Sequence, residues 1–297
     1  MKDGERMIFL SQLLNGLHIG SIYALIALGY TMVYGIVKLI NFAHGDIIMV
    51  GAYAALVALT FWGLPLYLAV IFSMALSVLL GVFIERVAYK PLRSSPRISS
   101  LITAIGVSIF LQNLSQFIFT ATPKPFPTVF HVEPLVIGGL SMGFTTLLTI
   151  GVAIVLMVGL QTFVSRSKAG KAMRAVSEDM GAAQLMGINV NTTISITFAL
   201  GSSLAAIGAV LYSASYPSLS PTMGSLPGLK AFIAAVLGGI GILPGAMLGG
   251  FILGIAESLT KAFVSSQLAD AVVYGILILV LLIKPAGLMG KKSTEKV

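Results

Sequence analysis

The side chains that could do chemistry are few, and three of them stand together in residues 40–53, INFAHGDIIMVGAY. Asn41, His44 and Asp46 place an amide, an imidazole and a carboxylate at the head of an apolar run, and the next charged residue is Glu85. Such groups at membrane depth mark substrate or ion sites. The same order also fits a helix start at a membrane surface, with Asn41 as N-cap and Asp46 near the positive end of the helix dipole. On that interpretation, His44 and Asp46 would act at the inner mouth of a pathway.

Only one other carboxylate falls deep within an apolar segment. Glu257 is followed four residues later by Lys261, which is the spacing of an ion pair on a helix. Glu85 stands beside Arg86 near the end of its segment. A single paired acid gives little support to a proton-coupled or sodium-coupled carrier.

Several kinds of chemistry are excluded or disfavoured by what the sequence lacks. There is no cysteine, and no G-x-x-x-x-G-K-[ST] phosphate loop, so the chain is not an ATPase by itself. His18, His44 and His131 fall on three different segments, which gives no paired-histidine metal motif. Metal catalysis and hydrolysis are therefore disfavoured, and transport powered by another polypeptide is the expected class of function.

The elements that must position these residues are membrane-spanning helices. The 297 residues are 57% apolar and only 9% charged, whereas soluble domains carry about 25% charged residues. About 20 apolar residues span a bilayer. The predicted fold is one all-α permease domain over 1–297, with about 8–9 transmembrane segments: 11–35, 42–62, 66–88, 98–120, 145–165, 191–214, 270–284 and the region 229–262.

The region 229–262 is interrupted by glycines and a proline. Its first limb, about 15 residues long, would rise only about 22 Å as a helix, short of the ~30 Å hydrocarbon core. The region is either two tightly joined spans or a re-entrant hairpin. The break contains Gly238, Gly239, Gly241, Pro244 and Gly245.

Basic residues predict the orientation. The predicted spans place three basic clusters and Lys38 on one side, namely Arg86 to Arg97, Arg166 to Arg174, and Lys284 with Lys291, Lys292 and Lys296. By the positive-inside rule this side is cytoplasmic, so the N-terminus is outside and the C-terminus inside. The net charge of +8 is then a topology signal, and no nucleic-acid partner is expected.

The loop 166–190 is the longest one on that side. Apolar residues recur at helical spacing between Arg174 and Leu185, and Gly187 suits a helix C-cap. The pattern predicts a short amphipathic helix. It could lie on the anionic leaflet or dock a cytoplasmic partner.

Four long segments carry a family resemblance. LINFAHGDIIMVGAY (39–53), IERVAYKPLRSSPRISSLITAIGVSIFLQN (84–113), SEDMGAAQLMGI (177–188) and GLKAFIAAVLGGIGILPGAMLGGFILGIAESL (228–259) resemble the LivH-type permeases of branched-chain amino acid ABC importers. The resemblance implies a bacterial inner-membrane permease that works with a LivM-type permease, two cytoplasmic ABC ATPases and an extracytoplasmic substrate-binding protein. ATP and Mg²⁺ would be used by those ATPases, and this chain would hold no cofactor or metal.

The resemblance also makes the loop 166–190 the expected ATPase-coupling loop. ABC importers in general carry E-A-A-x-x-x-G there, and this chain keeps Ala182, Ala183 and Gly187 but has Gly181 in place of the glutamate. Glu178 and Asp179 stand just before it and are candidates to replace that acid.

The pathway is expected at the interface between the two permeases. Leucine, isoleucine and valine are the substrates that the resemblance implies, with urea, short amides or other amino acids as alternatives. A partner-free channel or ion-coupled carrier is the alternative from another class. Candidate residues for the pathway or its gate are Tyr23, Thr31, Tyr34, Asn41, His44, Asp46, Gly238, Gly239, Gly241, Pro244 and Gly245.

Overall fold

The predicted all-α membrane fold is confirmed by a computed structural model that describes residues 2–39, 41–93, 95–130, 132–137 and 140–290. Ile40, His131, Lys291, Lys292 and Lys296 of the predicted segments lie outside these residues. Seven helices of the described residues are long and apolar enough to cross a membrane. They belong to α1 (Lys2–Val37), α3 (Leu66–Ile84), α4 (Arg97–Phe119), α5 (Phe144–Arg166), α8 (Val190–Ser215), α10 (Leu243–Phe263) and α11 (Ala269–Ile283).

The remaining elements are shorter. Two apolar helices, α2 (His44–Thr60) and α9 (Ser225–Gly238), are too short to count as spans. Helices α6 (Lys168–Glu178) and α7 (Met180–Leu185) replace the single amphipathic helix that the sequence predicts. The others are a π-helical turn η1 (Glu85–Tyr89), 3-10 turns η2 (Lys90–Leu92) and η3 (Ser266–Leu268), and strands β1 (Lys124–Pro125), β2 (Leu135–Ile137), β3 (Leu140–Met142) and β4 (Ser218–Leu219). β1 pairs with β4 and β2 with β3, both antiparallel.

Helix α1 is the centre of the bundle and packs against α5, α8, α9 and α10. Glycines bring its backbone into contact with that of α10. A Cβ atom on Gly254 would lie 2.3 Å from Cα of Gly20, and one on Gly16 would lie 2.6 Å from Cα of Ile255. The small-residue spacing of these segments therefore predicts a real interface, because in a membrane helices associate through close packing rather than through exclusion of water.

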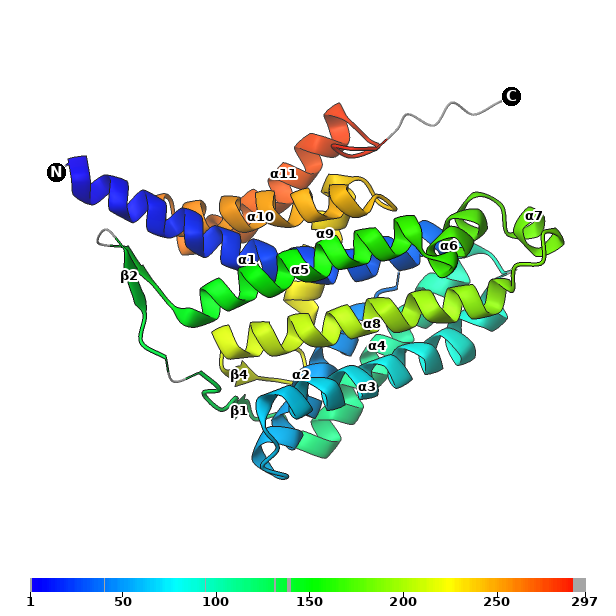
Figure 1. Cartoon of the computed structure of the whole chain (residues 1–297), viewed down its shortest axis with the longest axis horizontal. Helices are drawn as coiled ribbons and strands as arrows, with labels where there is room; N and C mark the ends of the chain where they lie inside the picture. Colours follow the sequence, from blue (N-terminus) through cyan, green and yellow to red (C-terminus); the bar gives the residue numbers. More distant parts are fainter. Residues whose placement is uncertain (1, 40, 94, 131, 138–139, 291–297) are drawn as a thin grey trace.

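Basic residues gather on one side of the molecule, which we call the basic side. Figure 1 shows α6 and α7 at one end of the long helices, and β1, β2 and β4 at the other end. Helices α1, α3, α5 and α11 end on the basic side, and α4, α8 and α10 begin there. The described basic residues of all three predicted clusters therefore share one side, in agreement with the predicted spans.

Helix α2 begins deep inside the bundle. The ring of His44 lies against Gly29 of α1, and the carbonyl oxygen of Gly201 on α8 approaches the same glycine. Gly29 is about 12 Å of helix rise from Val37, and Gly201 is about 16 Å from Val190. Because Val37 and Val190 mark the basic side, α2 starts near the middle of a ~30 Å core. The predicted start at the inner surface, and the predicted full span 42–62, are therefore corrected.

Helix α9 begins at the same depth and runs in the opposite direction. Gly224 and Gly228 contact Gly45 in the first turn of α2, whereas the far end of α9 at Gly238 packs on Gly245. At 14 and 17 residues, α9 and α2 rise only about 21 and 25 Å. We call these two elements the half-helices.

The glycine-rich break of 229–262 is a tight turn on the basic side. Gly239 and Gly241 have φ values of +110° and +91°, a region that side chains with a Cβ atom rarely adopt. Gly241 lies beside Gly35 near the end of α1, and Pro244 occupies the first turn of α10. The region is thus one half-helix followed by one full span, so it is neither the two joined spans nor the re-entrant hairpin that the sequence predicts.

Candidate functional site

The half-helices meet at a cavity of about 240 Å³ between α1, α4 and α9. Aromatic and aliphatic side chains form most of its wall. Its polar groups come from the start of α2, the start of α9 and the middle of α4. The lining residues are Tyr30, Phe42, Gly45, Asp46, Ile105, Ser108, Ser225, Leu229 and Phe232.

Asp46 is the charged group of this cavity and is only 2% exposed. Nε2 of Gln112 donates to Oδ1 of Asp46 at 3.0 Å and also reaches Oγ of Ser108 at 3.2 Å and Oγ of Ser225 at 3.4 Å. Among the described residues, no lysine, arginine or histidine lies within ion-pair distance of this carboxylate. A buried charge with no counter-charge costs several kcal/mol, which makes the position a candidate functional site.

Glycine makes the junction of the half-helices possible. A Cβ atom on Gly224 would lie 1.9 Å from the carbonyl oxygen of Gly45, and one on Gly228 would lie 2.9 Å from Cα of Gly45. The two N-terminal turns therefore touch through backbone alone. Their aligned N–H groups concentrate partial positive charge around Asp46 and offset part of the cost of burying it.

His44 and Asn41 have different surroundings from Asp46. The imidazole of His44 fills the space beside Gly29 and packs edge-on to Tyr30 at a centroid distance of 4.5 Å. Asn41 does not cap α2, because the N-cap is Ala43, which has no side chain to accept a bond. Instead, Oδ1 of Asn41 accepts from the Tyr89 hydroxyl at 3.0 Å. These contacts hold the segment before α2 in place.

Tyr23 joins a second buried cluster. Its hydroxyl donates to Oε2 of Glu257 at 2.9 Å. Oε1 of Glu257 accepts from Lys261 at 2.6 Å, as predicted, and also from Lys230 of α9 at 2.8 Å. Lys230 continues to Asp270 of α11 at 2.7 Å. This charge cluster ties α1, α9, α10 and α11 together, and its two lysines balance its two acids.

The other predicted pathway residues lie on the basic side. Buried Thr31 lines a small cavity with α6 and the glycine-rich turn, and Tyr34 is half-buried one turn further along α1. Gly238 packs on Gly245, and the turn with Gly239, Gly241 and Pro244 adjoins the end of α1. Of the residues predicted for the pathway or its gate, only Asp46 therefore lines the cavity at the junction of the half-helices.

Sequence reasoning missed the partners of Asp46. An amide within a span is a signal of a buried polar role, but Asn113 and Gln116 in the same span carry it too, so the sequence does not single out Gln112. Ser225, Phe42 and Phe232 carry no comparable signal, because only the meeting of the half-helices brings them to one cavity.

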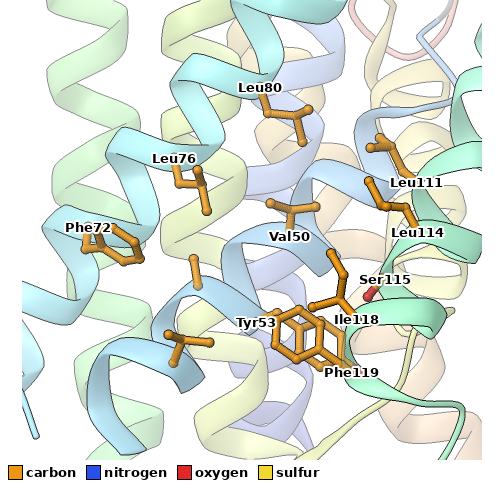
Figure 2. A pocket seen from close by; sticks show the side chains of 12 residues that line it. Val50, Tyr53, Phe72, Leu76, Leu80, Leu111, Leu114, Ser115, Ile118 and Phe119 are labelled. Atoms are coloured by element: carbon orange, nitrogen blue, oxygen red, sulfur yellow. The ribbon is translucent and has the colours of Figure 1, made fainter. Parts of the chain in front are cut away.

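A larger cavity of about 380 Å³ lies between α2, α3 and α4. Figure 2 shows Leu76 and Leu80 of α3 facing Leu111 and Leu114 of α4 across it, with Tyr53 and Phe119 stacked at one edge. Its wall is almost wholly apolar and has no charged group. It suits a hydrocarbon chain, and its polar side chains are the uncharged Tyr53 and Ser115. The described residues form no group of three or more metal-ligating side chains.

Helices α6 and α7 make up most of the loop 166–190, for which the coupling role remains a prediction. Asp179 separates them with an extended backbone and caps α7, since its Oδ1 accepts from the N–H of Ala182 at 2.9 Å. Gly187 ends α7 with φ +82°, and the bonds from Gly187 to Gln184 and from Ile188 to Ala183 complete a Schellman cap. The predicted role of Gly187 as a C-cap is confirmed.

The exposed face of α7 is apolar. Ala183 is buried against the body of the protein, whereas Leu185 and Met186 are 91% and 83% exposed. Ala182 and Glu178 are also exposed. An apolar tip that projects from a basic surface is a feature of a protein docking site.

Comparisons with known proteins agree with this architecture. Residues 12–282 match the family model described as the permease component of branched-chain amino acid transport systems. The chain belongs to this family. It is 46% identical to the high-affinity branched-chain amino acid transport system permease protein BraD of Pseudomonas aeruginosa, over 97% of this chain and 98% of the relative. It is 43% identical to the permease protein LivH of Escherichia coli strain K12, with 98% of both chains covered.

Solved structures are more distant. The chain of PsaBC from Streptococcus pneumoniae in complex with Fab is 15% identical and has a TM-score of 0.49, with 92% of this chain and 91% of that chain covered. The family and the seven apolar helices make this branched-chain permease family member a multi-pass membrane protein.

Proposed function

We propose that this chain is a permease subunit of an ATP-driven importer that carries leucine, isoleucine and valine across the bacterial inner membrane. The observation that carries the proposal is the family match over residues 12–282, to which near-full-length relatives at 46% and 43% identity add support. The absence of a phosphate loop in the sequence agrees with energy supplied by other subunits.

The proposed partners are a LivM-type permease, two cytoplasmic ATPases and an extracytoplasmic binding protein. ATP and Mg²⁺ belong to the ATPases, and this chain has no catalytic role of its own. The basic side is proposed as cytoplasmic by the positive-inside rule, which puts the N-terminus outside and the C-terminus inside.

The arrangement of α6 and α7 suggests how ATP binding is transmitted. Helix α6 packs on α1, α5 and α8, and α7 packs on α8. A movement of the ATPases that displaces α7 would therefore be passed to α1 and α8, the two long helices that flank the start of α2. Rigid-body shifts of such packed helices can switch access from one side to the other.

Reconstitution tests the function. The complete complex in proteoliposomes, with ATP on the ATPase side and the binding protein on the other, should import leucine in strict dependence on ATP. The permease alone should give no flux, and flux without the ATPases would support a channel or carrier instead. A panel with urea, short amides and other amino acids in the same assay would reveal a different substrate.

The docking role of α7 gives a variant prediction. Replacement of both Leu185 and Met186 by serine should lower co-purification of the ATPases by about tenfold or more, because exposed apolar patches mark protein interaction sites and the change removes apolar area from the contact. Lys171→Ala on the exposed part of α6 is the control and should leave association close to that of the native protein. Unchanged association of the double variant would show that α7 is not the docking element.

A further inference from the structure

We propose that the cavity at the junction of the half-helices binds the substrate amino acid in transit, with Asp46 accepting its ammonium group. The inference rests on the proposed function for the class of substrate, and on the geometry of the cavity for the place. It assigns a binding contact inside the permease, separate from recognition by the binding protein.

The first argument is charge. Asp46 lines the cavity, is 2% exposed, and has no cation within ion-pair distance among the described residues. The other buried carboxylates of the described residues each have a basic partner, since Glu85 pairs with Arg93 and Glu257 with two lysines. Asp46 is thus the buried acid that faces a cavity without a basic partner among the described residues, and a cationic group in the cavity would supply that partner.

The second argument is shape. The cavity volume of about 240 Å³ suits a small molecule, and the wall opposite the polar groups is apolar. Phe42, Phe232 and Leu229 would contact an aliphatic side chain while the ammonium reaches Asp46. Ser225 begins α9 at the rim, and the uncapped first turn of that helix suits the carboxylate of the same molecule. A branched-chain α-amino acid has these three parts.

The third argument is access. The side chain of Gln112 contacts Asp46, Ser108 and Ser225. The side of α9 that carries Ser225, Leu226 and Leu229 is exposed. The cavity therefore lies beside an exposed face of α9, and we place the partner permease there because the proposed pathway runs between the two permeases. A contact at such an interface is well placed to form and break as the two permeases move.

The charge of Asp46 is tested first by transport. Asp46→Asn retains the size of the side chain and its ability to accept from Gln112, and removes the charge. In the complete complex, leucine import should fall at least about tenfold, which corresponds to about 1.4 kcal/mol. Glu5→Gln, which removes an exposed carboxylate near the N-terminus, is the matched control and should import at the native rate. Native import by an assembled Asp46→Asn complex would overturn the proposal.

A second measurement does not require that variant to fold. The chain has no cysteine, so Ser225→Cys provides a single thiol at the rim of the cavity. In the complex that carries Ser225→Cys and keeps Asp46, we compare the reaction rates of cationic aminoethyl methanethiosulfonate and anionic sulfonatoethyl methanethiosulfonate. The ratio of the cationic rate to the anionic rate should be at least about tenfold higher at this thiol than on free cysteine. Saturating leucine should slow the cationic reagent.

The outcomes separate the two proposals. Equal relative rates of the two reagents would overturn the ammonium site, whatever the transport assay shows. If the native complex imports no branched-chain amino acid, the proposed function fails, and a preference for the cationic reagent would still support a cation-binding cavity.

Discussion

Gly224→Ala is expected to abolish leucine import by the reconstituted complex. The added Cβ atom would lie 1.9 Å from the carbonyl oxygen of Gly45 and 2.8 Å from its carbonyl carbon, where ordinary contact begins at 3.4 Å. Both atoms are backbone in the first turn of α2, so no side chain can rotate away. The half-helices would have to separate, which would move Asp46 relative to Ser225. Import of radiolabelled leucine measures the effect, and co-purification of the partners shows whether the complex assembles.

The backbone of Gly224 makes this a test of close approach alone. Its φ and ψ are −79° and −16°, which alanine adopts without strain. Gly151→Ala in α5 is the matched control, because a Cβ atom there has no neighbour within 4 Å and alanine favours a helix by about 1 kcal/mol over glycine. We expect native import from the control. Native import by Gly224→Ala would mean that the contact between the half-helices is not required.

Glu257→Gln is expected to cause the largest loss of stability. The carboxylate accepts from Lys230, Lys261 and the hydroxyl of Tyr23, and its side chain is 2% exposed. The neutral amide would leave Lys230, with a side chain 8% exposed, to rely on half-exposed Asp270. Removal of one partner of a buried ion pair costs about 3–5 kcal/mol. Thermal aggregation of the detergent-purified chain should therefore begin at a clearly lower temperature.

Two further variants identify the source of that loss. Lys261→Gln removes a lysine whose side chain is 40% exposed, so it should cost about 1 kcal/mol or less. Glu257→Gln combined with Lys230→Gln leaves no buried lysine without its acid and should recover part of the lost stability. If Lys261→Gln is as damaging as Glu257→Gln, or the double variant is additive, the buried pair is not what holds α9 to α10.

Much of the fold could be predicted because it depends on local composition. Apolar length gave the spans, and the positions of Lys and Arg placed the basic side. Gly16, Gly20, Gly250 and Gly254 indicated a close helix interface, and Gly187 indicated a helix end. The pair of Glu257 and Lys261 follows from spacing on one helix. Each of these inferences concerns residues within one segment or a pattern that any membrane helix must obey.

Other features depend on contacts between distant segments. Apolar residues 42–62 look like a span, yet α2 starts at mid-depth because the chain from Val37 returns into the bundle beside Gly29 and Gly201. Lys230 is a charged residue within the predicted apolar region 229–262, and only the fold brings Glu257 and Asp270 to neutralise it there. Asn41 would be a good N-cap by residue type, but Tyr89 binds its side chain instead.

The sequence by itself thus determined that this chain is a polytopic helical permease, with a one-sided basic face and a long helical loop on that face. Only the tertiary structure decided that Asp46 stands at the junction of two half-helices, across from Ser225 and Gln112. The physical reason is that hydropathy measures how well a segment tolerates lipid and says nothing about depth. The depth of Asp46 is set by backbone contact between Gly45 and Gly224, which lie far apart in the chain.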